Sequence, residues 1–186
     1  MRTVLAAALA FTFVPLSSAA PAQTPANGTA IDIPNSEIQA IAKRNAGAPV
    51  SDQQIRVVSI NGEYNVGVGV VHRAKTERQS VGGSEHSEIT EIYHVISGTG
   101  TFVTGGTIEN AKDRPADNEA VRILTGPSRE GSRIINGTSR KIGPGDVIII
   151  PPNTPHTFTE ITSPEIEYLV VRVDPHKVLP AGYAAK

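Results

Sequence analysis

The feature that most constrains the fold of this chain is a series of short, β-branched segments, each closed by Gly, Pro or Asn. Only residues 35–45 have the apolar spacing of a helix, with Asn35 and Ser36 as candidate caps and Gly47 as its end. Many short strands with turn residues between them bury their apolar faces in a sandwich or a closed barrel. We therefore predict an all-β fold, a single β-barrel with a short N-terminal helix.

The first two predicted strands form a hairpin, because Asn61-Gly62 between them is a dipeptide typical of a two-residue turn. In the second strand, alternate valines share one face with His72. Gly67 and Gly69 lie on the other face, where another group can pack closely. The predicted strands are 55–60, 64–72, 91–96, 101–104, 147–150 and 165–173.

The N-terminus has the order of a secretory signal peptide. Arg2 is followed by an apolar run over residues 4–16 and then by small residues up to Ala22. The run is too short to span a bilayer, so we predict cleavage near Ala22 and export to the periplasm or the extracellular space. The predicted divisions are a signal peptide at 1–22, an N-terminal arm with the helix at 23–50, and the barrel at 51–180.

Residues 108–133 are polar and carry no clear helix or strand pattern. We predict a long loop there. It is either a lid over the mouth of the barrel or a surface insertion without a function.

The charge and the cysteine count exclude several classes of function. The chain has 17 basic and 18 acidic residues with no basic block, so we expect no nucleic-acid partner and no membrane partner for the mature protein. It has no cysteine, which excludes disulfides, thiol nucleophiles and thiolate metal sites. The partner that remains is a small molecule.

Two distant segments carry residues suited to metal binding. In the first, His86 is followed after four residues by Glu91 and after six more by Gly98. In the second, residues 145–156 run from a Gly-Asp turn through an apolar strand and a Pro-rich turn to His156. Two imidazoles and one carboxylate are enough to hold a divalent ion and leave positions open for a substrate.

These segments resemble the two motifs of the cupin superfamily, and the resemblance spans about residues 66–173. It implies a single cupin or jelly-roll barrel and a divalent ion (Fe, Mn, Ni or Zn) held by His86, Glu91 and His156. Asn153 stands where the family has glycine, and asparagine tolerates the left-handed backbone that glycine supplies.

The sequence also departs from the family pattern. Ser84 stands where the family has its first histidine, and Glu160 replaces an asparagine that often follows the second motif. Ser84 is a poor ligand that holds at most a metal-bound water. His72 supplies a fourth ligand or an acid–base group if its strand face points into the barrel, and otherwise ends a strand at the solvent. We assign proton transfer to Glu91 or Glu160.

Four further residues are candidates for contact with a substrate. Tyr93 shares strand parity with the inward Glu91, Phe102 and Phe158 lie on flanking strands, and Arg73 can bind an acidic group. Aromatic residues at such positions are more often plain core than substrate contacts, and Arg73 is equally well explained as a solvated strand end.

The resemblance implies three kinds of function. The leading hypothesis is a metal-dependent enzyme that oxidises a small oxygenated molecule with dioxygen, as family members that act on quercetin and diketones do. The alternatives are an isomerase or lyase, and a non-catalytic protein that binds a sugar-like molecule. A homodimer is also expected, because single-domain relatives commonly pair through their sheets.

Overall fold

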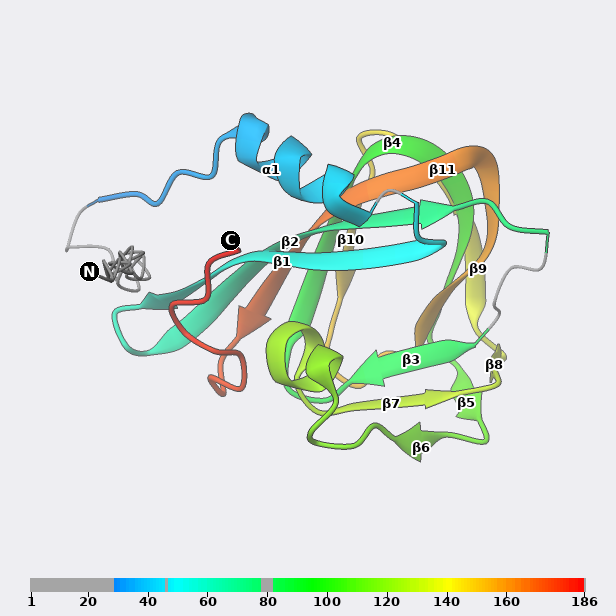
Figure 1. Cartoon of the computed structure of the whole chain (residues 1–186). Helices are drawn as coiled ribbons and strands as arrows, with labels where there is room; N and C mark the ends of the chain where they lie inside the picture. Colours follow the sequence, from blue (N-terminus) through cyan, green and yellow to red (C-terminus); the bar gives the residue numbers. More distant parts are fainter. Residues whose placement is uncertain (1–28, 46, 78–81, 186) are drawn as a thin grey trace, which may run out of the picture.

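The computed structural model describes residues 29–45, 47–77 and 82–185, and it confirms the all-β prediction. One helix, α1 (Asn35–Ala42), continues as a 3-10 turn, Lys43–Asn45, and the strands curve around a single core (Figure 1). The predicted signal peptide, 1–22, lies outside the described residues. In the part of the chain that the structure describes, no helix is both long and apolar enough to cross a membrane.

Within the described ranges, nine strands belong to one antiparallel sheet, and two form a small separate ribbon. The large sheet contains β1 (Val50–Ile60), β2 (Tyr64–Ala74), β3 (Gly83–His86), β4 (Thr90–Thr104), β6 (Lys112–Asp113), β7 (Ser128–Gly131), β9 (Thr138–Ile142), β10 (Val147–Ile150) and β11 (His156–Asp174). The ribbon contains β5 (Thr107–Glu109) and β8 (Arg133–Ile135).

The two longest strands, β4 and β11, pair with each other along most of their length and form the centre of the fold. The predicted strands 91–96 and 101–104 are two halves of β4. Gly98 lies between the halves with φ 77°, and a Cβ there would lie 2.0 Å from the carbonyl oxygen of Glu165. Only glycine fits at this bend, where β4 and β11 curve together.

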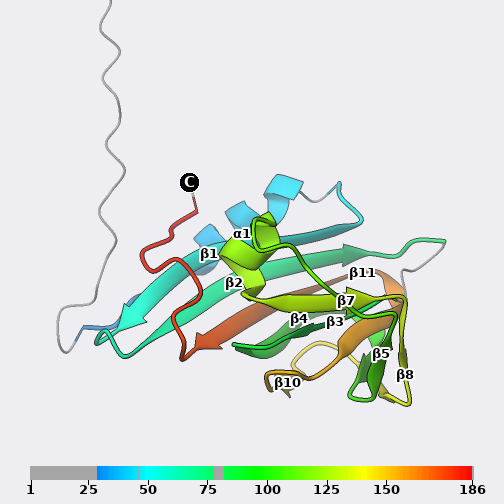
Figure 2. The ribbon, with the colours of Figure 1, turned by 90° about the horizontal axis from the view of Figure 1, so that it is seen from below.

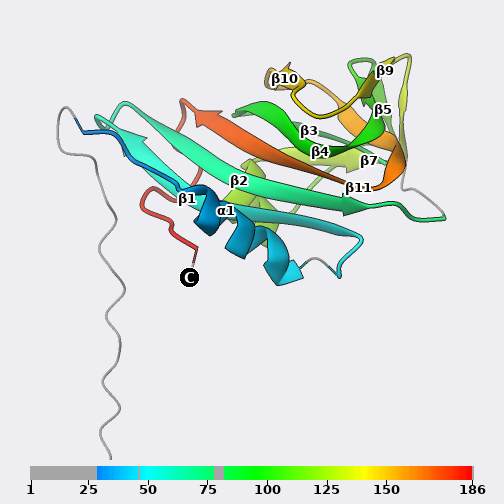
Figure 3. The same ribbon diagram turned by 90° about the horizontal axis from the view of Figure 1, so that it is seen from above.

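Helix α1 covers the outer face of the sheet, along β1 and β2 (Figure 3). Its N-terminal boundary residue is Pro34, which makes no side-chain cap, so the predicted Asn35 and Ser36 caps are wrong. Val70 packs with α1, whereas its neighbour Val71 belongs to the core inside the barrel.

The face of β2 that carries His72 is therefore outside the barrel, because His72 has the same strand parity as Val70. His72 is buried, and its Nε2 lies 3.0 Å from Glu165 Oε2. The alternative that placed His72 at the metal site as a fourth ligand is wrong. The opposite face of β2, which carries Gly67, Gly69 and Arg73, points inward.

The segment 108–133 is not the long loop that its polarity predicts. It forms β6, a π-helical turn (Val121–Thr125) and β7, and β7 pairs with β3 from Gly83↔Gly131 to His86↔Ser128. Seen from below, β7 and β3 lie side by side across the lower side of the molecule (Figure 2). The segment thus builds a wall beside the end of β3.

Candidate metal centre

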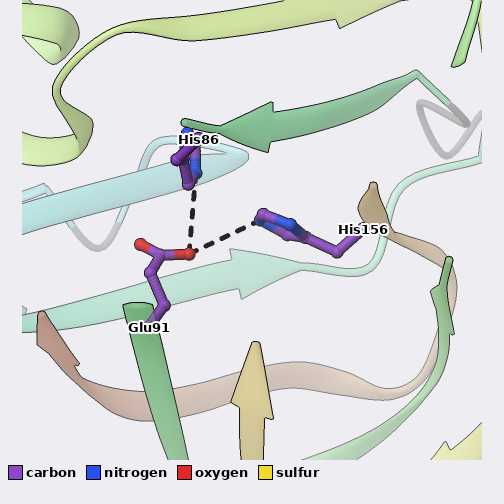
Figure 4. Close-up of side chains that lie close together, drawn as sticks. All are labelled: His86, Glu91 and His156. Atoms are coloured by element: carbon purple, nitrogen blue, oxygen red, sulfur yellow. Dashed lines mark ion pairs between the residues drawn. The ribbon is translucent and has the colours of Figure 1, made fainter. Parts of the chain in front are cut away.

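Three strand ends bring His86, Glu91 and His156 together inside the barrel (Figure 4). His86 ends β3, Glu91 lies at the start of β4 and His156 begins β11. The Nε2 atoms of His86 and His156 lie 3.6 and 3.5 Å from Glu91 Oε2. All three residues are buried, with exposed fractions of 7%, 2% and 6%. The structure thus juxtaposes the three side chains that the motif spacing singles out.

The Pro-rich turn before β11 holds the first motif in place. The backbone N–H of Asn153 donates to the carbonyl oxygen of His86 at 2.8 Å. Asn153 has φ 58°, so the left-handed backbone that its motif position predicts is present. The turn also starts β11, where His156 pairs with Ser84 of β3. One short turn therefore fixes both histidines relative to each other.

Hydrogen bonds at Nδ1 determine the tautomer of each histidine. The Nδ1 of His156 lies 3.0 Å from the carbonyl oxygen of Thr154, which can only accept, so Nδ1 carries the proton. The hydroxyl of Ser128 donates to the carbonyl oxygen of Gly126 at 2.7 Å and so accepts from His86 Nδ1 at 2.8 Å. Nδ1 thus carries a proton in both rings, and in the neutral imidazole Nε2 presents its lone pair toward Glu91, as metal-binding imidazoles do.

Glu91 is oriented by two donors. Arg172 Nε donates to Glu91 Oε1 at 3.0 Å, and the Tyr93 hydroxyl donates to Glu91 Oε2 at 2.9 Å. The same guanidinium donates to Gln54 Oε1 at 2.8 Å and to Asp52 Oδ2 at 2.5 Å. Arg172 is 1% exposed and has all three of its guanidinium nitrogens bonded, so it fixes the carboxylate rigidly.

Burial and charge set the ionisation of the cluster. Burial lowers the pKa of His86 to about 3, although the Glu91 carboxylate raises it in part. Burial alone would raise the pKa of Glu91, but His86, Arg172, His156 and the Tyr93 hydrogen bond lower it to about 2. Burial and the nearby carboxylate raise the pKa of Tyr93 well above its usual value. At neutral pH the cluster thus holds a neutral His86, a carboxylate and a phenol.

Arg172 packs against both glycines of β2, together with Gln53 at Gly69 and Gln54 at Gly67. A Cβ at Gly69 would lie 3.1 Å from Arg172 Nη1 and 2.8 Å from the carbonyl oxygen of Gln53. A Cβ at Gly67 would lie 3.3 Å from Arg172 Cβ. The glycines predict a close neighbour but do not identify it. A lone arginine between the valines of β11 was the available signal, and the sequence prediction missed it, together with Ser128.

The donor set fits a divalent cation. With both histidines in the neutral form, two imidazole lone pairs and a carboxylate oxygen converge in a buried site, with 3.5–3.6 Å between each Nε2 and Glu91 Oε2. Acceptors placed in this way repel one another unless a positive charge lies between them. Two nitrogens and one oxygen suit Fe, Mn, Ni or Zn, and the geometry does not distinguish among these ions.

A cavity of about 610 Å³ opens beside the cluster, and His156 is in its wall. All four predicted substrate contacts, Arg73, Tyr93, Phe102 and Phe158, line it, as does Ser84. The Phe102 ring lies 6.2 Å from the His156 ring and 4.8 Å from the Phe158 ring, measured between centroids. The buried aromatic residues thus form the floor between the cluster and the far end of the cavity.

Glu160 is not at the site. It is exposed, and its Oε2 accepts a hydrogen bond from the Thr101 hydroxyl at 3.4 Å. A register shift between Phe158 and Glu160 places two residues of β11 opposite one residue of β4. Simple alternation from His156 and Phe158 would turn Glu160 inward, and the bulge turns it outward. The predicted catalytic role of Glu160 is therefore wrong.

A comparison with family models matches the C-terminal part of the chain. The family described as the AraC-like ligand binding domain matches residues 131–182, which include β9, β10, β11 and His156 but neither His86 nor Glu91. No curated protein matches the sequence.

Solved structures of similar arrangement come from distant proteins. A Bacillus halodurans protein is 15% identical, with a TM-score of 0.46 over 84% of this chain and 89% of its own. A cupin protein from Bacteroides fragilis is 14% identical, with a TM-score of 0.38 over 65% and 78%. KdgF from Halomonas is 12% identical, with a TM-score of 0.39 over 68% and 79%.

Proposed function

We propose that the chain is a single domain of the cupin superfamily and a metal-dependent enzyme that oxidises a small oxygenated molecule with dioxygen. The observation that carries this proposal is the convergence of two imidazole Nε2 atoms and a carboxylate oxygen in a buried cluster, one member of which, His156, lines a cavity. Three protein ligands leave positions free for other molecules, as in oxygenases with two histidines and one carboxylate.

A divalent ion in this site supplies Lewis acidity toward a substrate oxygen and, if it is redox-active, electron transfer with dioxygen. His86 and His156 are the imidazole ligands, and Glu91 is the charged ligand. Arg172 keeps Glu91 ionised and aligned, so the ligand set is organised before any ion binds.

We assign proton transfer to a residue next to the three metal ligands. With a pKa of about 2, Glu91 is a weak base and serves as a ligand. Tyr93 lines the cavity, and its hydroxyl donates a hydrogen bond to Glu91 Oε2, which makes it the best-placed group to hold or release a proton there. Phe102 and Phe158 exclude water from the same wall.

Reconstitution tests the proposal. Chelator-treated protein is loaded separately with Fe(II), Mn(II), Ni(II) or Zn(II), and oxygen uptake is recorded with small diketones, phenols and hydroxy acids. We expect uptake with a redox-active ion that is abolished by His156→Gln and retained by His176→Gln, a change at an exposed histidine. Metal binding without oxygen uptake would refute the oxidation and leave an isomerase or lyase.

A second candidate function is ligand binding without turnover. It is favoured by the match of residues 131–182 to a family described as a ligand binding domain. A pure binder holds its ligand equally well after chelator treatment. Calorimetric titration of metal-free and metal-loaded protein with the same compounds therefore separates the two functions.

A further inference from the structure

Arg73 is a cation in the cavity wall that forms no direct ion pair with any residue that the structure describes. It follows the core residue Val71 on the inner face of β2 and lines the cavity. Its Nε donates to the Tyr168 hydroxyl at 3.0 Å, and its Cζ lies 5.2 Å from the centroid of the Phe158 ring. Among the described residues, no carboxylate lies within ion-pair distance of Arg73, and neither of its Nη groups has a hydrogen-bond partner.

This arrangement differs from that of Arg172, which satisfies two carboxylates and an amide at the same inner face. A guanidinium that is fixed by a ring and a phenol, with its outer fork free, presents two parallel donors to a carboxylate. An unpaired charge in a partly buried wall is costly unless an anion or water completes it.

The charges of the rest of the cavity favour an anionic ligand. Lys112 and Arg114 also line it, and Glu130 is the carboxylate in the lining. Arg114 Nη2 lies 2.6 Å from Glu130 Oε2, so these two charges neutralise each other. Arg73 and Lys112 remain, and the cavity has a net positive charge.

We propose that this cavity binds a small carboxylic acid, with its carboxylate on the Arg73 guanidinium and an oxygen-bearing end toward the cluster. The assignment of the second end rests on the proposed function, whereas the Arg73 subsite depends only on the cavity. Between Arg73 and His156 lie the Phe158 and Phe102 rings, so the middle of the ligand is apolar or aromatic. The volume of about 610 Å³ is in the range of small-molecule sites.

Binding of matched charged and neutral probes tests the subsite. Chelator-treated protein is titrated calorimetrically with phenylacetate, 4-hydroxyphenylacetate and the uncharged phenylacetamide. We expect each carboxylate to bind the native chain about tenfold or more tightly than the amide. Arg73→Gln should remove this preference, and Arg73→Lys, which keeps the charge without the fork, should retain part of it. Arg140→Gln, at an exposed arginine, should leave it unchanged.

The preference of the native chain keeps the test decisive even if Arg73→Gln does not fold. Equal binding of acid and amide, no binding of either at millimolar concentration, or a preserved preference in folded Arg73→Gln would each overturn the subsite. Metal content is measured separately on the same samples. Failure of the native chain to bind metal would refute the proposed function but not the Arg73 subsite. Normal metal binding without a preference for the carboxylates would refute only the subsite.

Discussion

Replacing Arg172 with methionine removes the central charge of the network behind the candidate metal centre. The guanidinium is 1% exposed and donates to Glu91, Gln54 and Asp52. Methionine fills much of the same volume but donates no hydrogen bond. In metal-free protein the variant leaves the Glu91 carboxylate buried, with a side chain 3% exposed and no counter-charge from arginine.

The size of the effect follows from burial. Breaking a buried ion pair by removing one partner costs about 3–5 kcal/mol, and Glu91 meets that condition. The Asp52 side chain is 27% exposed and regains water, so it adds little. Arg56→Met is the matched control, because the Arg56–Glu37 pair has side chains 30% and 23% exposed. For such a pair we expect a loss of about 1 kcal/mol or less.

Urea unfolding followed by circular dichroism, in the presence of a chelator, gives both free energies of unfolding. A second change then tests the cause. Glu91→Gln in the Arg172→Met background removes the unpaired charge and should restore about 1–3 kcal/mol. Equal losses of unfolding free energy for Arg172→Met and Arg56→Met, or no recovery in the double variant, would show that the unpaired charge of Glu91 does not cause the destabilisation.

Three further predictions concern the same region. The free energy of unfolding of metal-free protein should fall by roughly 2–3 kcal/mol from His86 alone as the pH drops from 6 to 4. The cause is that His86 binds a proton near pH 6.5 in the unfolded chain but has a pKa of about 3 in the folded chain. His86→Asn should flatten this part of the denaturation profile, and an unchanged slope in the variant would contradict the prediction. Saturating divalent metal should raise the melting temperature, because a hundredfold excess over Kd stabilises the folded state by about 2.7 kcal/mol. His156→Gln should abolish this rise and His176→Gln should keep it, which calorimetry of the native protein and the two variants measures. Gly69→Ala should lower the free energy of unfolding by about 1–3 kcal/mol, since its Cβ would lie 2.8 Å from the carbonyl oxygen of Gln53 and 3.1 Å from Arg172 Nη1. A neutral result in urea titration would contradict this clash and show that β2 has room to shift.

Strand content and the three-residue cluster were predictable because both depend on local rules. Alternation and turn residues predict β1, β2 and β10, and the spacing of two short motifs singles out His86, Glu91 and His156. Asn153 was also predictable, since its left-handed backbone is a property of the turn itself.

The remainder depends on contacts that one segment cannot report. The bulge that turns Glu160 outward exists only in the pairing of β11 with β4. The side of β2 that faces inward is decided by the docking of α1, so strand parity alone could not place His72. The polar strand β7 forms through its backbone pairing with β3, and this pairing brings Ser128 next to His86.

Elemental analysis of purified protein, reloaded with one divalent ion at a time and desalted, tests directly whether His86, Glu91 and His156 bind a metal. We expect one ion per chain in the native protein and in His94→Gln, a change at an exposed histidine of β4. We expect strongly reduced metal occupancy in His86→Gln and His156→Gln. Native protein that retains no ion, or variants of the two buried histidines that retain it fully, would contradict the assignment of this cluster as a metal centre.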